Sequence, residues 1–196
     1  SGSLLNENPY PPSPKVVAAV QAVLENSADV LRLYPDPDAT VLKQAIAKQQ
    51  HVPVENVFVG NGSDEVLAHI FKAFFVQDKP ILYPDITYSF YPVYSQFFGL
   101  ATKTKIIPLN DDFEIVIDDY KQSNGGIIIT NPNAPTSIAV GLSAIEEVLQ
   151  ANPDSVVVID EAYVDFGAES AVKLVEKYEN LVVCQTTSKS RSLAGL

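Results

Sequence analysis

Short apolar runs rich in β-branched residues recur along the chain, and segments with helical spacing of apolar positions separate them. We expect strands at residues 57–59, 81–83, 105–109, 127–130, 156–159 and 181–184. Helices are expected at residues 15–25, 39–50, 64–75, 88–98, 143–150 and 171–178. Strands that alternate with helices form a mainly parallel sheet with helices on both faces. The pattern therefore predicts an α/β fold.

Proline is concentrated near the beginning of the chain, in the run Asn8-Pro9-Tyr10-Pro11-Pro12-Ser13-Pro14. Closely spaced prolines favour an extended backbone, so the run predicts an arm. We expect residues 1–30 to form this N-terminal arm with a first helix, and residues 31–196 to form the larger domain. The second helix is expected to begin after Asp38, which would serve as its N-cap.

Charge and composition exclude two classes of partner. The formal net charge is -11 at pH 7 and the pI is about 4.5, so the protein would repel the phosphate backbone of a nucleic acid. No apolar stretch reaches the roughly 18 to 20 residues that span a bilayer, and no membrane association is expected. The single Cys184 cannot form an internal disulfide, which favours the cytoplasm. His51 and His69 stand apart, so no metal site is predicted.

Polar clusters follow four of the predicted strands. They occupy residues 60–65, 131–133, 160–163 and 186–189. In open parallel sheets, ligands bind beyond the carboxyl ends of the strands, where the loops converge. We therefore expect these four clusters to form one composite site.

The first cluster has the composition of a phosphate-binding turn. Gly60 and Gly62 allow close backbone approach, and the helix that begins near Ser63 and Asp64 would offer exposed amide donors. The same residues also fit an ordinary strand-to-helix turn in which Ser63 is the N-cap. This cluster alone does not decide between the two interpretations.

Asp160 directly follows a strand that is apolar throughout, so its charge would lie in a buried position. Such a carboxylate needs a cationic partner. A protonated pyridine nitrogen is one candidate, because a cofactor ring that acts as an electron sink needs that proton held in place. The alternatives are that Asp160 caps a helix or pairs with an arginine.

Lys189 lies just past the last apolar run, among small hydroxyl residues. Partial desolvation lowers the pKa of a lysine and makes the neutral, nucleophilic amine accessible. Thr186 and Ser188 could add donors to a phosphate. The alternative is a solvated loop lysine.

Tyr88 stands at the start of a predicted helix crowded with aromatic residues. Its ring could stack on a flat cofactor. Core packing explains the same aromatic pattern, and the two interpretations stay open.

Taken in this order, the segments resemble the histidinol-phosphate aminotransferases, a family of fold type I, class II, pyridoxal-phosphate-dependent enzymes. The resemblance spans nearly the whole chain. It is carried by LNENPY at 5–10, YPDP at 34–37, VGNGSDE at 59–65, TY at 87–88, NPNAPT at 131–136, DEAY at 160–163, SK at 188–189 and LAGL at 193–196. It implies that the chain comprises the N-terminal arm and most of the large domain of such an enzyme.

The resemblance implies a role for each matching residue. Lys189 would hold pyridoxal 5'-phosphate as an imine, Asp160 would bind the protonated ring nitrogen, and Tyr163 would hydrogen-bond the ring hydroxyl. Tyr88 would stack on the ring. Tyr34 would reach the phosphate bound to the neighbouring subunit, which implies a homodimer. Within the subunit, the phosphate would be held by Ser63, Asp64, Thr186 and Ser188.

Two features depart from the family pattern. The family has a second Asn before its Pro-Thr where this chain has Ala134, with Ser137 in place of Gly, so Asn133 or Asn131 becomes the candidate for the ring hydroxyl. The chain also ends at Leu196, before the family's phosphate-binding arginine, its remaining strands and its small domain. We therefore expect the 196-residue chain by itself to be inactive.

The implied reaction transfers an amino group from histidinol phosphate to a 2-oxo acid, 2-oxoglutarate, in histidine biosynthesis. Asn8 and Tyr10 are the candidates for substrate contact. Other interpretations are a broad aromatic aminotransferase, a phosphoamino-acid decarboxylase and a non-catalytic module that binds the cofactor. A plain nucleotide-binding domain is a further alternative, although the chain has neither of the glycine-rich motifs typical of that class.

Overall fold

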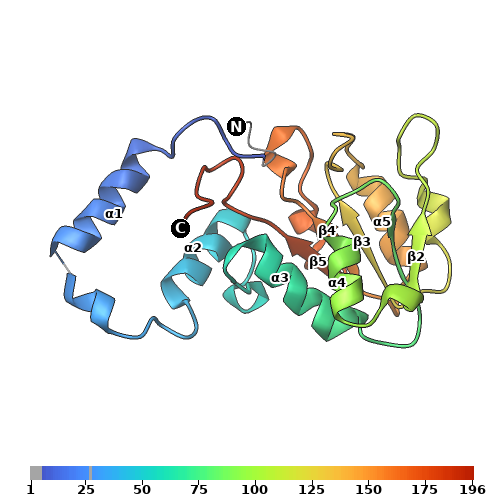
Figure 1. Ribbon diagram of the computed structural model, residues 1–196, viewed down its shortest axis with the longest axis horizontal. Helices are drawn as coiled ribbons and strands as arrows, with labels where there is room; N and C mark the ends of the chain where they lie inside the picture. Colours follow the sequence, from blue (N-terminus) through green and yellow to red (C-terminus); the bar gives the residue numbers. More distant parts are fainter. Residues whose placement is uncertain (1–5, 27) are drawn as a thin grey trace. The chain divides into compact units, whose positions relative to one another are not determined.

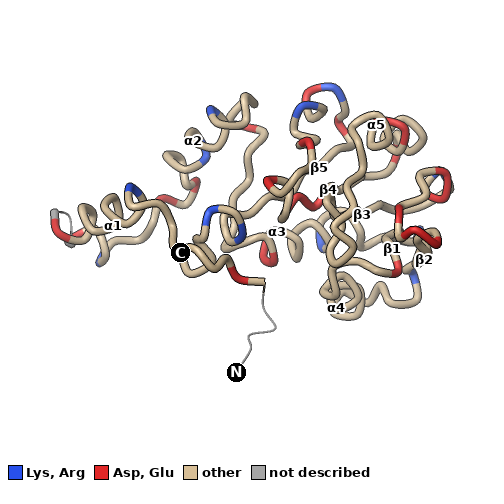
Figure 2. The backbone as a smooth tube through the Cα atoms, turned by 90° about the horizontal axis from the view of Figure 1, so that it is seen from above, with Lys and Arg blue, Asp and Glu red and all other residues tan. Residues whose placement is uncertain are grey.

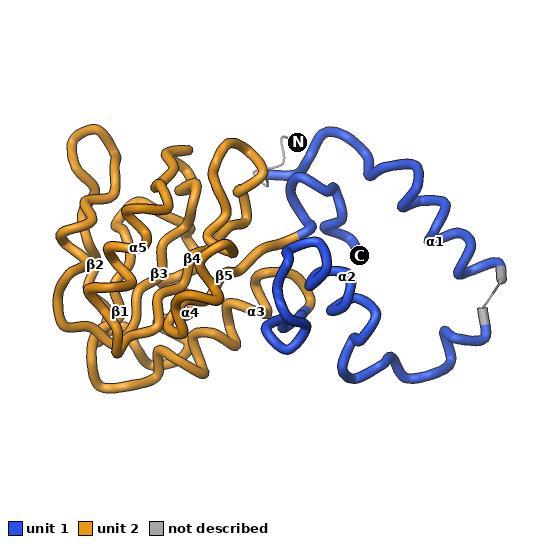
Figure 3. The backbone as a smooth tube through the Cα atoms, turned by 180° about the vertical axis from the view of Figure 1, so that it is seen from behind, with its two compact units in different colours: residues 1–60, 187–196 blue, residues 61–186 orange. Residues whose placement is uncertain are grey.

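A computed structural model describes residues 6–26 and 28–196. The chain divides into two compact units, which Figure 3 distinguishes by colour. One unit comprises residues 61–186, and the other comprises residues 1–60 together with 187–196. The predicted boundary between residues 30 and 31 stays a prediction.

The 61–186 unit is built on a parallel five-stranded sheet with the strand order β2-β1-β3-β4-β5. Its strands are β1 (Ile81–Pro84), β2 (Thr104–Ile107), β3 (Gly126–Thr130), β4 (Val157–Asp160) and β5 (Leu181–Cys184). β3, β4 and β5 end in register, because Thr130 lies opposite Asp160 and Asp160 lies opposite Cys184. The predicted parallel sheet is confirmed.

Helices cover both faces of this sheet (Figure 1). Side chains alternate between the faces along a strand, so Ile127 and Ile129 belong to one apolar cluster and Ile128 to the other. The first cluster includes α5 (Leu142–Ala151). The second includes α3 (Gly62–Ile70), the π-helical turn η3 (Phe71–Phe75) and α4 (Tyr91–Phe97). The two apolar layers confirm the predicted α/β fold.

Strand β3 begins at a glycine that lies against the π-helical turn. Gly126 has a φ of +153°, and a Cβ atom there would lie 2.4 Å from the ring of Phe75. Phe75 is fully buried and meets the ring of Phe71 edge-on, with 5.0 Å between the ring centroids. The missing side chain therefore lets η3 pack directly on the sheet.

Short helical turns complete this unit. They are η4 (Ala101–Lys103), η5 (Ile117–Tyr120), η6 (Val164–Phe166) and η7 (Ala171–Leu174). Acidic residues are numerous near β1 and β2 and along α5 (Figure 2). Some are paired, since Lys121 bonds Glu147 at 2.9 Å and Lys177 bonds Glu146 at 2.5 Å.

The other unit contains α1 (Pro14–Asn26), η1 (Ala28–Arg32), α2 (Thr40–Gln50) and η2 (Val54–Asn56). The prediction that Asp38 caps α2 is wrong. The Asp36 carboxylate accepts the backbone N–H of Thr40 at 2.8 Å, while Ala39 holds the N-cap position in a left-handed conformation. Asp36 stands four residues before Thr40 in the sequence. Capping preferences of residue types do not predict this hydrogen bond, because it depends on how the loop bends.

Residues 57–59 were expected to form a strand, and the described sheet contains none there. Val57 has extended dihedral angles, φ -107° and ψ 122°, yet it follows the turn η2 directly. A β-branched run becomes a strand only where a second strand pairs with it, and the sequence cannot show that partner.

Three predicted helices have different bounds. The helix expected at 64–75 starts at Gly62 and ends in the π-helical turn, and the one expected at 88–98 starts only at Tyr91, with Pro92 in its first turn. Of the helix expected at 171–178, only η7 forms, and the Ser170 hydroxyl accepts from Val172 N there. Among the described residues, no helix is long and apolar enough to span a bilayer.

Candidate functional site

The carboxylate at the end of β4 lies inside the 61–186 unit. Asp160 is 2% exposed. Its Oδ2 accepts the hydroxyl of Tyr91 at 2.7 Å, and its Oδ1 accepts the backbone N–H of Ala162 at 3.2 Å. The side chain is therefore held at both oxygens by neutral donors.

Burial, with a smaller contribution from the charge of Asp64, raises the pKa of Asp160 from an ordinary 3.8 to about 6. The bonds from Tyr91 and Ala162 lower the pKa but do not offset the burial. No cation of the described residues figures among these influences. A cation that bound here would relieve the desolvation of the carboxylate, as the sequence predicted for this position.

A line of hydroxyl groups leads away from Asp160 across the ends of the strands. The hydroxyl of Tyr91 lies 2.7 Å from that of Thr130, and Thr130 lies 3.1 Å from Thr87. Thr87 donates to Asn133 Oδ1 at 2.8 Å. These contacts connect the ends of β3 and β4 with the loop before α4.

The two asparagines of the loop after β3 are both buried and engaged. Asn133 Nδ2 donates to the backbone oxygen of Ile86 at 2.8 Å and to Thr136 Oγ1 at 3.2 Å. Asn131 bonds the backbone of Val140 through both its oxygen and its nitrogen, at 2.8 and 3.0 Å. Both side chains hold the loop around Ala134 in shape.

The start of α3 presents backbone amides at the same edge of the sheet. The helix begins at Gly62, whose φ is +74°, and Asn61 holds the N-cap position without a side-chain cap bond. Ser63 lies inside the helix, so the predicted Ser63 cap is wrong. The Glu65 carboxylate accepts the N–H of Asn61. The first-turn amides of Gly62, Ser63 and Asp64 have no acceptor within a helix, which suits an anion.

Tyr88 connects α3 to the Asp160 region. Its hydroxyl donates to Asp64 Oδ1 at 2.8 Å, and its ring meets that of Tyr91 edge-on, with 5.5 Å between the centroids. Burial raises the pKa of Tyr88, and the charge of Asp64 adds to the effect. Tyr94 donates to the backbone oxygen of Asp64 at 2.9 Å. Asp64 is therefore fixed by two tyrosines.

The loop after β4 is anchored by a second buried acid. Glu161 is 1% exposed and accepts from Ser170 Oγ at 2.7 Å, from Ala171 N at 2.6 Å and from Gln185 Nε2 at 2.8 Å. Tyr163 follows in this loop and is half-buried. Tyr163 contributes to the raised pKa of Tyr88, so the two phenol groups lie near each other. Thr186, also half-buried, lies two residues after β5.

The other predicted residues belong to the unit formed by residues 1–60 and 187–196. There Lys189 Nζ donates to the backbone oxygen of Asn6 at 3.0 Å, and Asn8 Nδ2 donates to the backbone oxygen of Lys189 at 3.0 Å. Ser188 is half-buried, while Tyr10 is 75% exposed and Tyr34 is fully exposed. The arm therefore holds the lysine loop.

Within the 61–186 unit, the structure gathers Ser63, Asp64, Tyr88, Asn133, Asp160, Tyr163 and Thr186 at the carboxyl edge of the sheet. Sequence reasoning missed Tyr91, Thr130 and Glu161. The signal for Glu161 was its place inside the strand-end cluster. Tyr91 and Thr130 looked like core residues, because a buried hydroxyl is not visible in a hydrophobic pattern.

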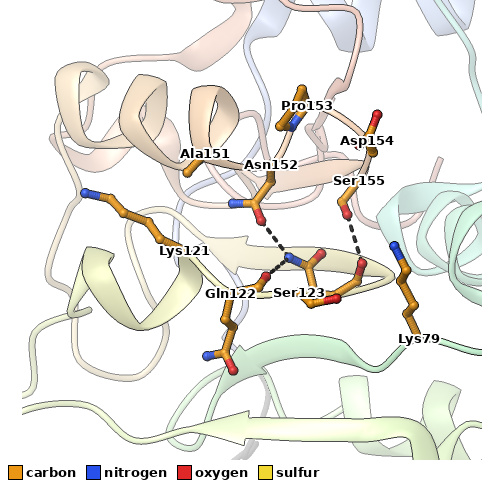
Figure 4. Close-up of a pocket in the computed structure, with 10 residues that line it drawn as sticks. Lys79, Lys121, Gln122, Ser123, Ala151, Asn152, Pro153, Asp154 and Ser155 are labelled. Atoms are coloured by element: carbon orange, nitrogen blue, oxygen red, sulfur yellow. Dashed lines mark hydrogen bonds between the residues drawn. The ribbon is translucent and has the colours of Figure 1, made fainter.

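A pocket of the same unit lies at the opposite edge of the sheet (Figure 4). Its lining comes from the segments that precede β1, β3 and β4, with Lys79 and Lys121 on either side. Asn124 and Asn152 bond each other there at 2.7 Å. None of the predicted site residues lines this pocket.

The fold of the chain is similar to the folds of solved aminotransferases. It matches the histidinol-phosphate aminotransferase of Clostridium acetobutylicum with a TM-score of 0.82 at 20% identity, over 97% of this chain and 57% of that one. It matches the histidinol-phosphate aminotransferase of Sinorhizobium meliloti, solved with pyridoxal-5'-phosphate, with a TM-score of 0.80 at 23% identity, over 97% and 52%. The chain belongs to the aminotransferase class I and II family, whose model matches residues 4–196.

The curated relatives with high sequence identity to this chain are histidinol-phosphate aminotransferases. The chain is 83% identical over 191 residues to the histidinol-phosphate aminotransferase of Acinetobacter baumannii strain ATCC 17978. The match covers 97% of this chain and 52% of the relative. It is 62% identical to histidinol-phosphate aminotransferase 2 of Dechloromonas aromatica, over 97% and 53%. The chain thus spans about half the length of these relatives. A polypeptide that continues it to their length is called the full-length protein below.

The raised pKa of Asp160 predicts how stability depends on pH. Above pH 3.8 an unfolded chain loses this proton, whereas the folded protein keeps it up to about pH 6, so ionisation at higher pH opposes folding. We expect Asp160→Asn to raise the unfolding free energy of the cofactor-free full-length protein by up to about 3 kcal/mol at pH 8. At pH 4 the effect should nearly vanish. Urea denaturation at both pH values measures the difference.

The control for this test is Asp154→Asn, at an exposed position at the opposite edge of the sheet. It should change stability little at either pH. If Asp160→Asn raised the unfolding free energy equally at pH 4 and pH 8, the raised pKa assigned to Asp160 would be contradicted.

Proposed function

We propose that the full-length protein is a pyridoxal-phosphate-dependent histidinol-phosphate:2-oxoglutarate aminotransferase of histidine biosynthesis. The observation that carries the proposal is the 83% identity to the Acinetobacter baumannii histidinol-phosphate aminotransferase across 97% of the chain. The buried acid at the end of β4 and the amides at the start of α3 support the same chemistry.

The residues of the 61–186 unit fit this cofactor. Asp160, buried and without a cationic influence from the described residues, suits a protonated ring nitrogen. The amides of Ser63 and Asp64, with the hydroxyl of Thr186, suit the phosphate. Tyr88 would lie against the ring and Tyr163 would donate to the ring hydroxyl. Asn133 would support the site through its bond with Thr87.

Lys189 is the proposed point of attachment. It follows Cys184 by five residues, a stretch that reaches at most about 18 Å, and Cys184 lies opposite Asp160 in the sheet. Ser188 would add a phosphate donor. The bound cofactor supplies an electron sink that stabilises negative charge on the substrate carbon. Lys189 Nζ would take the proton from the carbon that bears the substrate amino group and deliver it again later.

We expect borohydride reduction of the full-length protein with bound cofactor to label Lys189. Peptide mapping should find the pyridoxyl group on the peptide that contains Ser188-Lys189-Ser190, because the lysine amine forms the reducible bond. Lys189→Ala should lose the visible absorbance of the bound cofactor. Lys48→Ala, on α2, is the matched control and should keep it. Label on another lysine would overturn the assignment.

Substrate choice belongs to the same proposal. We assign substrate contact to Asn8 and Tyr10 of the arm; the Asn8 amide already holds the lysine loop, and Tyr10 is exposed. The acceptor would be a 2-oxo acid. A second candidate function is phosphoamino-acid decarboxylation. It is favoured by the likeness to L-threonine-O-3-phosphate decarboxylase of Porphyromonas gingivalis, with a TM-score of 0.76 at 25% identity over 95% of this chain and 55% of that one.

We expect the full-length protein to convert 2-oxoglutarate to glutamate when histidinol phosphate is supplied, and to release no carbon dioxide from L-threonine-O-3-phosphate. Lys189→Ala should abolish the glutamate signal, because the proton transfer needs that amine. Glutamate is measured by chromatography and carbon dioxide by a coupled assay. Carbon dioxide release without glutamate would replace the first function by the second.

We further propose that the full-length protein is a homodimer with a shared site. Residues of α1 and its surroundings expose many apolar side chains, among them Val17, Val20, Leu24, Leu31 and Leu33. Val17, Val20 and Leu24 follow helical spacing and so form one stripe. A contiguous exposed apolar surface of this kind is typical of an interface, and a second copy of the chain would cover it.

Tyr34 would cross this interface to the phosphate held by the partner subunit, since its side chain is fully exposed in the single chain. We expect Tyr34→Phe to weaken cofactor binding about fivefold, the loss of one hydrogen bond. Tyr10→Phe, which changes an exposed tyrosine of the N-terminal arm, is the control. Equilibrium dialysis measures the affinity and sedimentation the mass. An active monomer, or unchanged affinity in Tyr34→Phe, would refute the shared site.

We place the protein in the cytoplasm. Cys184 is 2% exposed, and burial raises the pKa of its thiol, so it is protonated and unreactive. A lone buried thiol fits a reducing compartment, and the proposed biosynthetic role fits the same location.

A further inference from the structure

The hydroxyl of Tyr91 has no part in the roles above, although it lies between two polar groups in the interior. The residue is 0% exposed, and its ring packs against Phe71 and Tyr83. The hydroxyl donates to Asp160 Oδ2 at 2.7 Å and lies 2.7 Å from Thr130 Oγ1. Packing needs only the ring, so the hydroxyl has a separate purpose.

We propose that Tyr91 is a positioning residue for Asp160: its hydroxyl fixes the direction of the carboxylate and stabilises the charged form that receives the ring nitrogen. The statement that the charged acid receives a ring nitrogen rests on the proposed function. The contact between Tyr91 and Asp160 is independent of that function.

Counting hydroxyl protons shows which way the bonds run. Tyr91 donates to Asp160, and Thr87 donates to Asn133 Oδ1. Asn133 cannot turn round, because its amide nitrogen donates to a backbone carbonyl. Thr130 then has one proton for two neighbours, Tyr91 at 2.7 Å and Thr87 at 3.1 Å. We assign this proton to the shorter contact, in which Thr130 donates to the hydroxyl of Tyr91.

Tyr91 therefore accepts from Thr130 while it donates to Asp160. A hydroxyl that accepts a bond becomes a stronger donor, so Thr130 strengthens the bond to the carboxylate. When Asp160 carries its proton, the Tyr91 hydroxyl can accept from it and donate to Thr130, which then donates to Thr87. Tyr91 thus anchors the acid in both protonation states, and it favours the charged state because the bond to a carboxylate is the stronger one.

Among the described residues of the 61–186 unit, the titratable groups coupled to Asp160 come from several elements, and none of them is basic. Asp64 on α3 raises the pKa of Asp160. Cys184 at the end of β5, Glu161, Tyr88 and Tyr94 each feel the charge of Asp160, and Tyr163 is a neighbour of Tyr88. The groups that stabilise the charged acid are the Tyr91 hydroxyl and the Ala162 amide. Removing the hydroxyl therefore raises the pKa further.

The test compares Tyr91→Phe with Tyr83→Phe in the cofactor-free full-length protein. Tyr83 is a matched control, a tyrosine of the same cluster that is 3% exposed, with its ring 5.8 Å from that of Tyr91. Aspartate labelled with ¹³C at the carboxyl carbon gives one resonance that Asp160→Asn removes, and this resonance is followed against pH. We expect its midpoint to rise by about one pH unit in Tyr91→Phe and to stay unchanged in Tyr83→Phe.

Thr130→Val gives a second, graded variant, because it removes the donor to Tyr91 and leaves the Tyr91 ring in place. It should raise the midpoint in the same direction by a smaller amount. If Tyr91→Phe does not fold, judged by circular dichroism, Thr130→Val decides the question.

An unchanged midpoint in Tyr91→Phe overturns the proposal, as does an equal rise in Tyr83→Phe, which would report packing alone. Pyridoxal phosphate itself is then added to each variant. Tyr91→Phe should raise the dissociation constant of the cofactor about fivefold at pH 6, because a smaller fraction of the variant then has a charged acid, and the difference should fade well above pH 7. Failure of the parent protein to bind the cofactor would refute the proposed function and leave the titration result standing.

Discussion

The desolvation of one carboxylate sets the conditions for the rest of the site. Asp160 ends a strand that has a parallel neighbour on each side, so the sheet removes it from water before any ligand arrives. A buried charge is tolerated only where hydrogen bonds or an opposite charge compensate it. β3 brings Thr130 opposite Asp160 by register, and α4 brings the hydroxyl of Tyr91 to within 2.7 Å. The core is thus polar where β3 and β4 end.

The carboxyl edge of the sheet has two electrical poles. Asp160 at the end of β4 and Asp64 on α3 together raise the free-energy cost of negative charge at Asp160 and favour a cation there. At the start of α3 the first-turn amides favour an anion. Tyr88 and Tyr94 hold Asp64 between the two poles. A molecule with a cationic ring and an anionic phosphate matches this arrangement, whereas a nucleotide would meet the acids with its base.

The sequence predicted the sheet well because buried parallel strands are continuous apolar runs. β5 was predicted to the residue, at 181–184, and the four other strands of the sheet were located within one or two positions at most ends. Residues 57–59 show the limit of the method, since a strand needs a partner that the pattern cannot name. Likewise, Asp38 was favoured as the cap of α2, although the chain bends so that Asp36 bonds Thr40.

The candidate site was predictable from the sequence where a polar residue of unusual type follows an apolar strand, as Asp160 does. It was not predictable where a residue acts through another. Tyr91 reads as one more aromatic residue in the run 88–98, and Thr130 as the last residue of a strand. Their importance lies in the direction of single hydroxyl groups, which depends on packing distances that no sequence period encodes.

The hydrogen bonds of Asn133 bear on the neighbouring position, where the family has an asparagine and this chain has Ala134. Asn133 uses its amide nitrogen on Ile86 and Thr136 and its oxygen on Thr87, so neither atom points to a ligand without breaking a buried bond. Asn133 therefore acts on the site through Thr87 and the hydroxyl line that ends at Asp160. Under the proposed function, contact with a ring hydroxyl would then fall to Tyr163, and the loop after β3 would contribute through the bond from Thr87 to Asn133.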